Sequence, residues 1–240
     1  MLTDRTRILG EDHPDTLASR NNLAGAYVSA GRLAEAITLY EQLLPDSTRI
    51  LGEDHPDTLT SRNNLAYAYR SAGRLTEAIT LYEQVLTDRT RILGEDHPDT
   101  LASRNNLAGA YVSAGRLAEA ITLYEQLLPD STRILGEDHP DTLTSRNNLA
   151  YAYRSAGRLT EAITLYEQVT TDRTRVLGKD HPDTLTSRNN LASAYHAAGR
   201  LTEAFMRLQA VCADCLRILG PDHPLTATVR ENLEAARRVL

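Results

Sequence analysis

The chain has 240 residues, of which 24% are charged and 41% hydrophobic, and its formal net charge is −6 at pH 7. Charges of both signs are interspersed without a basic block, which argues against a nucleic-acid partner. The apolar runs are short and the N-terminus is charged from Asp4 onward, so we expect neither a membrane-spanning helix nor a signal peptide. We therefore expect a cytoplasmic protein with no membrane partner. Two cysteines, Cys212 and Cys215, give no disulfide framework and agree with a reducing compartment.

An internal repeat dominates the chain. Residues 3–85 recur letter for letter at 87–169. Within this block, "ILGEDHPDTLASRNNLAGAYVSAGRLAEAITLYEQ" from Ile8 aligns with "ILGEDHPDTLTSRNNLAYAYRSAGRLTEAITLYEQ" from Ile50, so the unit is 42 residues long with odd and even versions. A fixed period of this length indicates stacked helical or strand units, because each unit contacts only its neighbours.

The repeat divides the chain into one continuous array. Residues 2–10 copy 86–94, so the chain is expected to begin inside a helix of a preceding repeat, as a piece of a longer array or an engineered version of one. Divergence in the fifth repeat, for example at Lys179 and Phe205, favours a natural origin. The predicted segments are a helix remnant at 1–10, repeats at 11–52, 53–94, 95–136, 137–178 and 179–220, and a C-terminal capping helix at 221–240.

Each repeat predicts two antiparallel helices. From Asp15 onward, apolar residues such as Leu17 and Ala24 recur at helical spacing, and Gly31 supplies a left-handed position that ends this first helix. A second apolar stripe, which includes Tyr40, predicts another helix that stops at Gly52.

Prolines interrupt the second helix in the odd repeats only. Pro45 and Pro129 lie inside the predicted helix, whereas the even repeats carry Thr87 and Thr171. An interior proline removes a backbone hydrogen bond and costs about 3 kcal/mol or more. We therefore expect a kink or a break in the odd repeats.

The run "NNLAxAYxxAGRLxEAIxLYEQ" resembles the tetratricopeptide repeat. Small Ala24 and Ala36 lie where its two helices approach, Tyr27 and Tyr40 fill the space between units, and Gly31 is at the turn. The joint "LGxDHPDTL" makes the unit longer than the usual ~34 residues, as in kinesin light chains, in nephrocystin-3 and in bacterial proteins with a nucleotide-binding switch domain. The resemblance implies an all-α, right-handed superhelical solenoid of antiparallel helix pairs.

The tripeptide His13-Pro14-Asp15 is similar to the active triplet of J-domain co-chaperones, but it recurs at the start of the first helix in all five repeats. Proline suits the first helical position and pushes the preceding residue into N-cap geometry, so we interpret the triplet as a helix start.

Histidines one repeat apart cannot converge on one ion, and the lone Cys212-Ala213-Asp214-Cys215 lies inside a helix. We expect no metal, no cofactor and, lacking a phosphate loop or nucleophile elbow, no enzyme.

The resemblance places a ligand groove on the unpacked face of the first helices. An asparagine in every repeat would hold the backbone of an extended peptide. Tyr67 and its copy would give amphipathic contact area, while Arg70 and its copy would pair with acidic side chains or a carboxylate. The alternative is that the asparagines bond across neighbouring helices and the arginines are solvated. The candidate peptide-binding residues are Asn21, Asn63, Tyr67, Arg70, Asn105, Asn147, Tyr151, Arg154, Asn189 and His196.

Three functions fit these features. The leading hypothesis is a non-catalytic scaffold that binds a peptide or protein segment in its concave groove. The second is self-assembly through an uncapped N-terminal end that exposes Leu2, Ile8 and Leu9. The third is the sensor arm of a larger nucleotide-binding switch protein.

Overall fold

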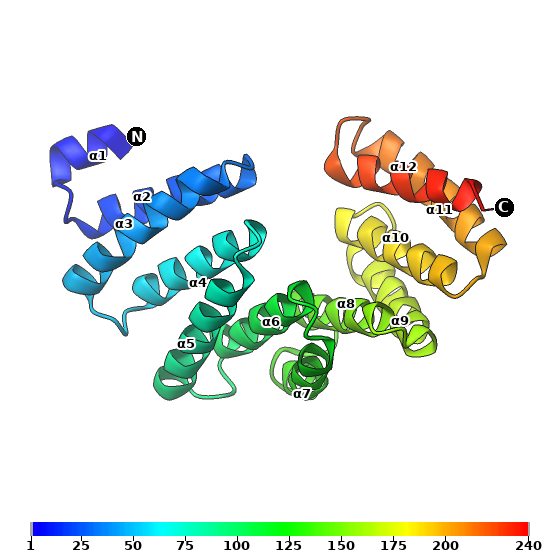
Figure 1. Ribbon diagram of the computed structural model, residues 1–240, viewed down its shortest axis with the longest axis horizontal. Coiled ribbons are helices and arrows are strands. Elements are labelled where there is room, and N and C mark those ends of the chain that lie inside the picture. The colour runs from blue at the N-terminus through cyan, green and yellow to red at the C-terminus, as the bar shows by residue number, and fades with distance from the viewer. Residues whose placement is uncertain (1, 240) are drawn as a thin grey trace. The chain divides into compact units, whose positions relative to one another are not determined.

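A computed structural model describes residues 2–239, which form α-helices in consecutive pairs and contain no β-strand (Figure 1). The chain divides into two compact units, of which the first ends at Arg116 and the second begins at Leu117. The first unit contains α1 (Leu2–Leu9), α2 (Pro14–Ser29), α3 (Leu33–Leu51), α4 (Pro56–Ser71), α5 (Leu75–Leu93) and α6 (Pro98–Ser113). The second contains α7 (Leu117–Leu135), α8 (Pro140–Ser155), α9 (Leu159–Leu177), α10 (Pro182–Ala197), α11 (Leu201–Ile218) and α12 (Pro224–Arg237).

The His-Pro-Asp triplet starts each first helix, as predicted. His13 has extended backbone angles (φ −76°, ψ 136°), and its Nδ1 accepts a hydrogen bond from the Asp15 N–H at 3.1 Å. Pro14 takes the first helical position, where its missing N–H costs nothing. The same cap recurs on α4, α6, α8 and α10, so the triplet is a structural joint between repeats.

Glycines with positive φ end both helices of a repeat. Gly31 (φ +73°) follows α2 and lets the Arg32 N–H donate to the Tyr27 carbonyl at 2.9 Å, while Gly52 (φ +99°) follows α3. A residue with a β-carbon is strained in this conformation. The predicted ends of both helices are thus confirmed.

Of the kink or break expected at the two interior prolines, the break is wrong, and the kink stays a prediction. Helix α3 runs unbroken through Pro45 and has the same length as α5, which carries Thr87 at this position. Leu43 and Ser47 on either side of the proline are buried, and such tertiary packing outweighs the loss of one helical hydrogen bond. Helix α7 likewise continues through Pro129.

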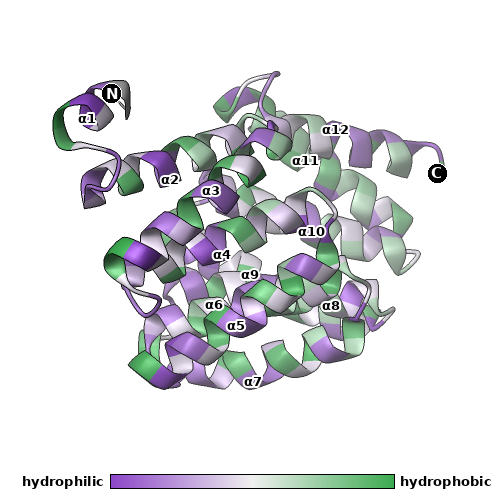
Figure 2. Ribbon diagram, turned by 60° about the vertical axis from the view of Figure 1, so that its left-hand side comes forward, coloured by the Kyte–Doolittle hydropathy of each residue, from purple (hydrophilic) through white to green (hydrophobic). Residues whose placement is uncertain are grey.

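Small and aromatic residues share the core of each repeat. Ala24 and Ala36 are fully buried where the two helices of the first repeat meet, and Tyr40 and Leu43 fill the space beside them. Hydrophobic and hydrophilic residues alternate along the helices (Figure 2), so each helix keeps one solvated side.

In each unit the first helices of successive repeats touch one another: α2 touches α4, α4 touches α6, and α8 and α12 touch α10. Among the described residues of either unit, no two second helices are in contact. The first helices are therefore packed more closely, which makes their free face the concave side of each unit.

Helix α12 caps the C-terminal end of the second unit. Its Val229 and Ala236 are fully buried against α10 and α11, and Leu225 and Leu233 are partly buried beside them. The opposite side carries exposed charges: Arg230, Glu231, Glu234, Arg237 and Arg238.

Candidate functional site

Two of the predicted groove residues are exposed tyrosines on first helices. Tyr67 on α4 and Tyr151 on α8 are 46% and 42% exposed, which is unusual for tyrosines in a chain whose other tyrosines are largely covered. Such rings offer contact area to a ligand at low entropic cost. These two tyrosines therefore mark an accessible surface in each unit.

Arginines stack on these exposed rings. The Arg70 guanidinium lies 5.5 Å from the Tyr67 ring centroid, and Arg154 lies 5.1 Å from that of Tyr151. Both arginines are partly buried, so they are not fully solvated. Among the described contacts, neither is paired with a carboxylate. Stacking holds the guanidinium in place and leaves its edge to bind an anion.

A buried tyrosine from the second helix lies beneath each stack. Burial raises the pKa of Tyr82 to about 12, with opposing contributions from the nearby Arg70 and Tyr67. Burial likewise raises the pKa of Tyr166, which is near Arg154 and Tyr151. Each unit therefore has a neutral phenol beside a cationic guanidinium.

Four side-chain polar atoms in the second unit are buried without a hydrogen-bond partner among the described residues. They are Arg154 Nε on α8, Tyr166 Oη and Thr170 Oγ1 on α9, and His196 Nε2 on α10. A buried donor without a partner typically costs about 1–3 kcal/mol. The helices α8, α9 and α10, which carry these atoms, pack against one another, and Arg154 lies near Tyr166.

The asparagines form a ladder between repeats. In each described bond, the second asparagine of the "NN" pair donates its side-chain N–H to the side-chain oxygen of the first asparagine in the preceding repeat. Four of the five first asparagines therefore have a structural role, which matches the alternative interpretation of these residues. The donor–acceptor pairs are Asn64–Asn21 (3.3 Å), Asn106–Asn63 (3.0 Å), Asn190–Asn147 (3.3 Å) and Asn232–Asn189 (3.0 Å).

Burial differs along this ladder. Asn147 and Asn189 are only 9% and 5% exposed, whereas Asn21, Asn63 and Asn105 are partly exposed. A ligand backbone would therefore reach the ladder more readily in the first unit.

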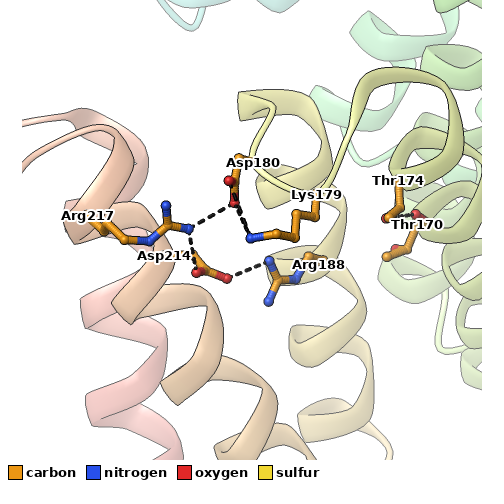
Figure 3. Close-up of polar contacts among 7 residues, drawn as sticks. All are labelled: Thr170, Thr174, Lys179, Asp180, Arg188, Asp214 and Arg217. Atoms are coloured by element: carbon orange, nitrogen blue, oxygen red, sulfur yellow. Dashed lines mark hydrogen bonds and ion pairs between the residues drawn. The ribbon is translucent and has the colours of Figure 1, made fainter.

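A chain of ion pairs, which the sequence did not suggest, ties each joint to the helices around it (Figure 3). Arg217 on α11 reaches Asp180 in the joint before α10 at 2.9 Å and Asp214 on its own helix at 3.0 Å. Asp214 also pairs with Arg188 on α10 at 2.8 Å. The Arg217 guanidinium, followed by the Lys179 ammonium, lowers the pKa of Asp180. These contacts are mostly exposed and repeat along the chain, so they stabilise the joint rather than form a unique site.

The same figure shows a local contact inside α9, where the Thr174 hydroxyl donates to the Thr170 carbonyl at 2.6 Å. This bond stays within one helical turn. It has no evident role beyond the helix.

Hollows also lie on the opposite side, between second helices. One of about 850 Å³ lies over α3, α4 and α5, and one of about 1130 Å³ lies over α7, α8 and α9. Pro45 and Tyr69 line the first, and Tyr69 donates to the Glu41 carboxylate at 2.7 Å. These hollows arise because the second helices do not touch, and the sequence pattern gave no sign of them.

The two cysteines are buried and form no disulfide with each other. Burial raises the pKa of Cys215, which packs with Cys212 and Val229 in the core under the cap.

Between residues 2 and 239, no group of three or more His, Cys, Asp or Glu side chains is placed to hold a metal ion. No helix in the described part of the chain has the length and apolarity needed to cross a membrane.

Helix pairs joined by capped turns, with adjacent first helices bonded through asparagines, define an all-α helical-repeat scaffold. A family model described as the tetratricopeptide repeat matches residues 2–46, 31–89, 63–130, 105–174 and 148–215. The chain therefore belongs to the tetratricopeptide repeat family, whose members typically serve protein–protein interaction. The predicted fold class and the resemblance to this family are confirmed.

The chain is similar to solved structures of kinesin light chain-like proteins. It is 38% identical to a kinesin light chain-like protein with nearly identical repeats from Podosopora anserina, with a TM-score of 0.72 over 85% of this chain and 97% of that one. BtubC (BKLC) from P. vanneervenii is 22% identical, with a TM-score of 0.71 over 92% of this chain and 89% of that one. The Rap protein complexed with Competence and Sporulation Factor is 11% identical, with a TM-score of 0.70 over 91% and 64%. The last two show the fold alone, and among curated proteins none matches the chain.

Proposed function

We propose that the concave face binds a peptide or protein segment and holds an acidic side chain or terminal carboxylate in the second unit. The observation that carries this proposal is the group of buried, unpartnered polar atoms on Arg154, Tyr166 and His196. A ligand acceptor at this position would recover the free energy that these atoms forgo when they leave water.

The chemistry of the three groups favours an acceptor-only ligand. Arg154 Nε is always a donor, the Tyr166 hydroxyl keeps its proton because burial raises its pKa, and His196 Nε2 donates in one neutral tautomer and in the cation. A carboxylate accepts from all of them. Exposed Tyr151 beside them adds apolar contact for the neighbouring part of the ligand.

The test uses peptides selected against the protein from a random display library. Their affinities are then measured by fluorescence anisotropy, and each acidic residue is replaced by its amide. The variant R70A/R154A removes both groove arginines. The control R74A/R158A removes two arginines that also stack on tyrosines, at 4.2 Å, but pair with glutamates outside the groove.

We expect R70A/R154A to weaken binding at least about tenfold and the control to change it less than about twofold, since tenfold corresponds to 1.4 kcal/mol. Replacing the critical acidic residue by its amide should have the same effect as R70A/R154A. Peptides that bind all variants equally would refute groove binding.

A second candidate, self-assembly through the N-terminal end, rests on α1. Ile8 is 67% exposed and Leu9 41%, whereas Ile92 and Leu93 at the same repeat positions are 38% and 36% exposed. The side chain of Leu2 lies outside the described residues. Exposed apolar surface of this kind favours contact with a second copy of the chain. Light scattering over a concentration series tests this, and a constant monomer mass would refute it.

A further inference from the structure

One position of the second helix alternates between arginine and serine along the array. Counting by the 42-residue unit, it is Arg5, Ser47, Arg89, Ser131 and Arg173, and it becomes Cys215 before the cap. Arg89 and Arg173 are only 8% and 5% exposed. Arginine is rarely buried to this extent unless its donors are satisfied.

The buried arginines are satisfied by the next repeat. Arg89 Nη1 donates to the Asp99 carbonyl at 3.1 Å and to Ser103 Oγ at 2.9 Å. Arg173 makes the same two bonds at the same lengths, to the Asp183 carbonyl and Ser187 Oγ. The space between an even repeat and the following repeat is thus shaped and lined for a guanidinium group.

Between the first and second repeats the arginine is missing but its surroundings remain. Ser47 occupies the position, and a cavity of about 240 Å³ opens between α2, α3 and α4. Asp57 and Ser61, which line it, are the counterparts of Asp99 and Ser103. Water takes about 30 Å³ per molecule in the liquid, so the cavity has room for a guanidinium group with part of its side chain.

The last junction shows the opposite outcome. Cys215 takes the place of the arginine there, and the facing serine is replaced by Val229, which packs on it in a closed apolar core. The polar lining is therefore lost where a small apolar residue fills the space. Beside Ser47 it is kept, since Ser61 is still present and only 5% exposed.

We infer that the cavity beside Ser47 is a binding site for the guanidinium group of an arginine side chain from another molecule. The Asp57 carbonyl and Ser61 Oγ are the acceptors, by analogy with the bonds of Arg89, and the Asp57 carboxylate adds negative charge. A planar guanidinium fits this pair of acceptors better than a compact ammonium. Asn21 on the concave face also lines the cavity, so an arginine carried by a segment in the groove reaches it.

This site is chemically distinct from the acid-binding position proposed above, because it accepts a cation and lies in the first unit. It does not depend on that proposal. R70A/R154A is expected to leave it unchanged, so the two proposals fail separately.

The experiment measures binding of N-acetyl-arginine methylamide by calorimetry, with N-acetyl-citrulline methylamide as the neutral isostere. Because residues 3–85 recur at 87–169, the test variant is S47R/S131R, which supplies the arginine from the chain itself. The control T38R/T122R adds the same two charges at exposed positions of the same helices.

We expect the arginine compound to bind the unchanged protein and the control at least about tenfold more tightly than the citrulline compound. Binding should be lost in S47R/S131R, which should also unfold at a higher temperature than the unchanged protein. If S47R/S131R does not fold, S61V/S145V, which copies the residue at the last junction, should lose binding instead. Equal binding of the two compounds, no binding, or full binding by the folded test variant would overturn the inference.

Discussion

Replacing Asn63 by alanine tests whether the asparagine ladder couples neighbouring repeats. The substitution removes the acceptor of the 3.0 Å bond from Asn106, which joins α4 to α6. Such a bond contributes about 0.5–1.5 kcal/mol net, while alanine in a helix returns up to about 0.7 kcal/mol of intrinsic propensity. The single variant is therefore expected to lose less than about 1 kcal/mol, and the coupling between the two asparagines is the informative quantity.

The assay is a double-mutant cycle of N63A, N106A and the double variant by urea unfolding, read by circular dichroism and tyrosine fluorescence. Both probes must give coincident transitions, because repeat arrays can unfold in parts. The expected coupling is about 1 kcal/mol. Asn22 is the matched control, since it holds the Asn106 position in the first repeat but is exposed, and N22A should be neutral or slightly stabilising. Coupling below about 0.3 kcal/mol, or an equal loss in N22A, would refute a structural ladder.

Three further predictions follow from single positions. Pro45→Thr restores a backbone donor in α3, as Thr87 has in α5, and should raise the free energy of unfolding by up to about 3 kcal/mol with unchanged helical circular dichroism; a decrease would contradict this. A hydrogen bond from Arg91 lowers the pKa of Asp54 below its unfolded value, so the stability it contributes is present above about pH 4 and lost as pH falls through the folded pKa. Asp54→Asn should therefore flatten the acid limb of a stability–pH curve, and an unchanged limb would disprove the link. Burial raises the pKa of Cys215, so Ellman's reagent should modify it at least about tenfold more slowly in the folded than in the urea-unfolded protein, and equal rates would show that it is accessible.

The features that the sequence predicted correctly depend on local chemistry. Pro14 and His13 specify a helix start within three residues, and Gly31 specifies an end through its own backbone angle. Because the repeat multiplies each signal five times, chance matches are excluded. The family resemblance then supplied the pairing of the helices.

The features that the sequence did not predict depend on contacts between repeats. The Asn106–Asn63 bond joins residues 43 apart, and its geometry follows from the spacing of α4 and α6. The cavity beside Ser47 depends on how three helices pack around the space that an arginine fills elsewhere, so the sequence alone does not reveal it. At Pro45 local propensity pointed to a break, and packing of the flanking residues prevailed.

The alternation of odd and even repeats has a functional consequence. Tyr67 and Arg70 lie in the C-terminal half of α4, and Asp57, Thr60 and Ser61 at the start of the same helix line the cavity beside Ser47, so one helix of the first unit carries both positions. An arginine edge attracts anions, whereas carbonyl and hydroxyl acceptors attract a guanidinium. A segment that satisfies both must carry an acidic residue near an arginine. A peptide with both charges should therefore bind more tightly than peptides with either one alone, and R70A/R154A and S47R/S131R should each remove only the contribution of one charge. If both variants weakened binding of a purely acidic peptide equally, the two positions would be one site.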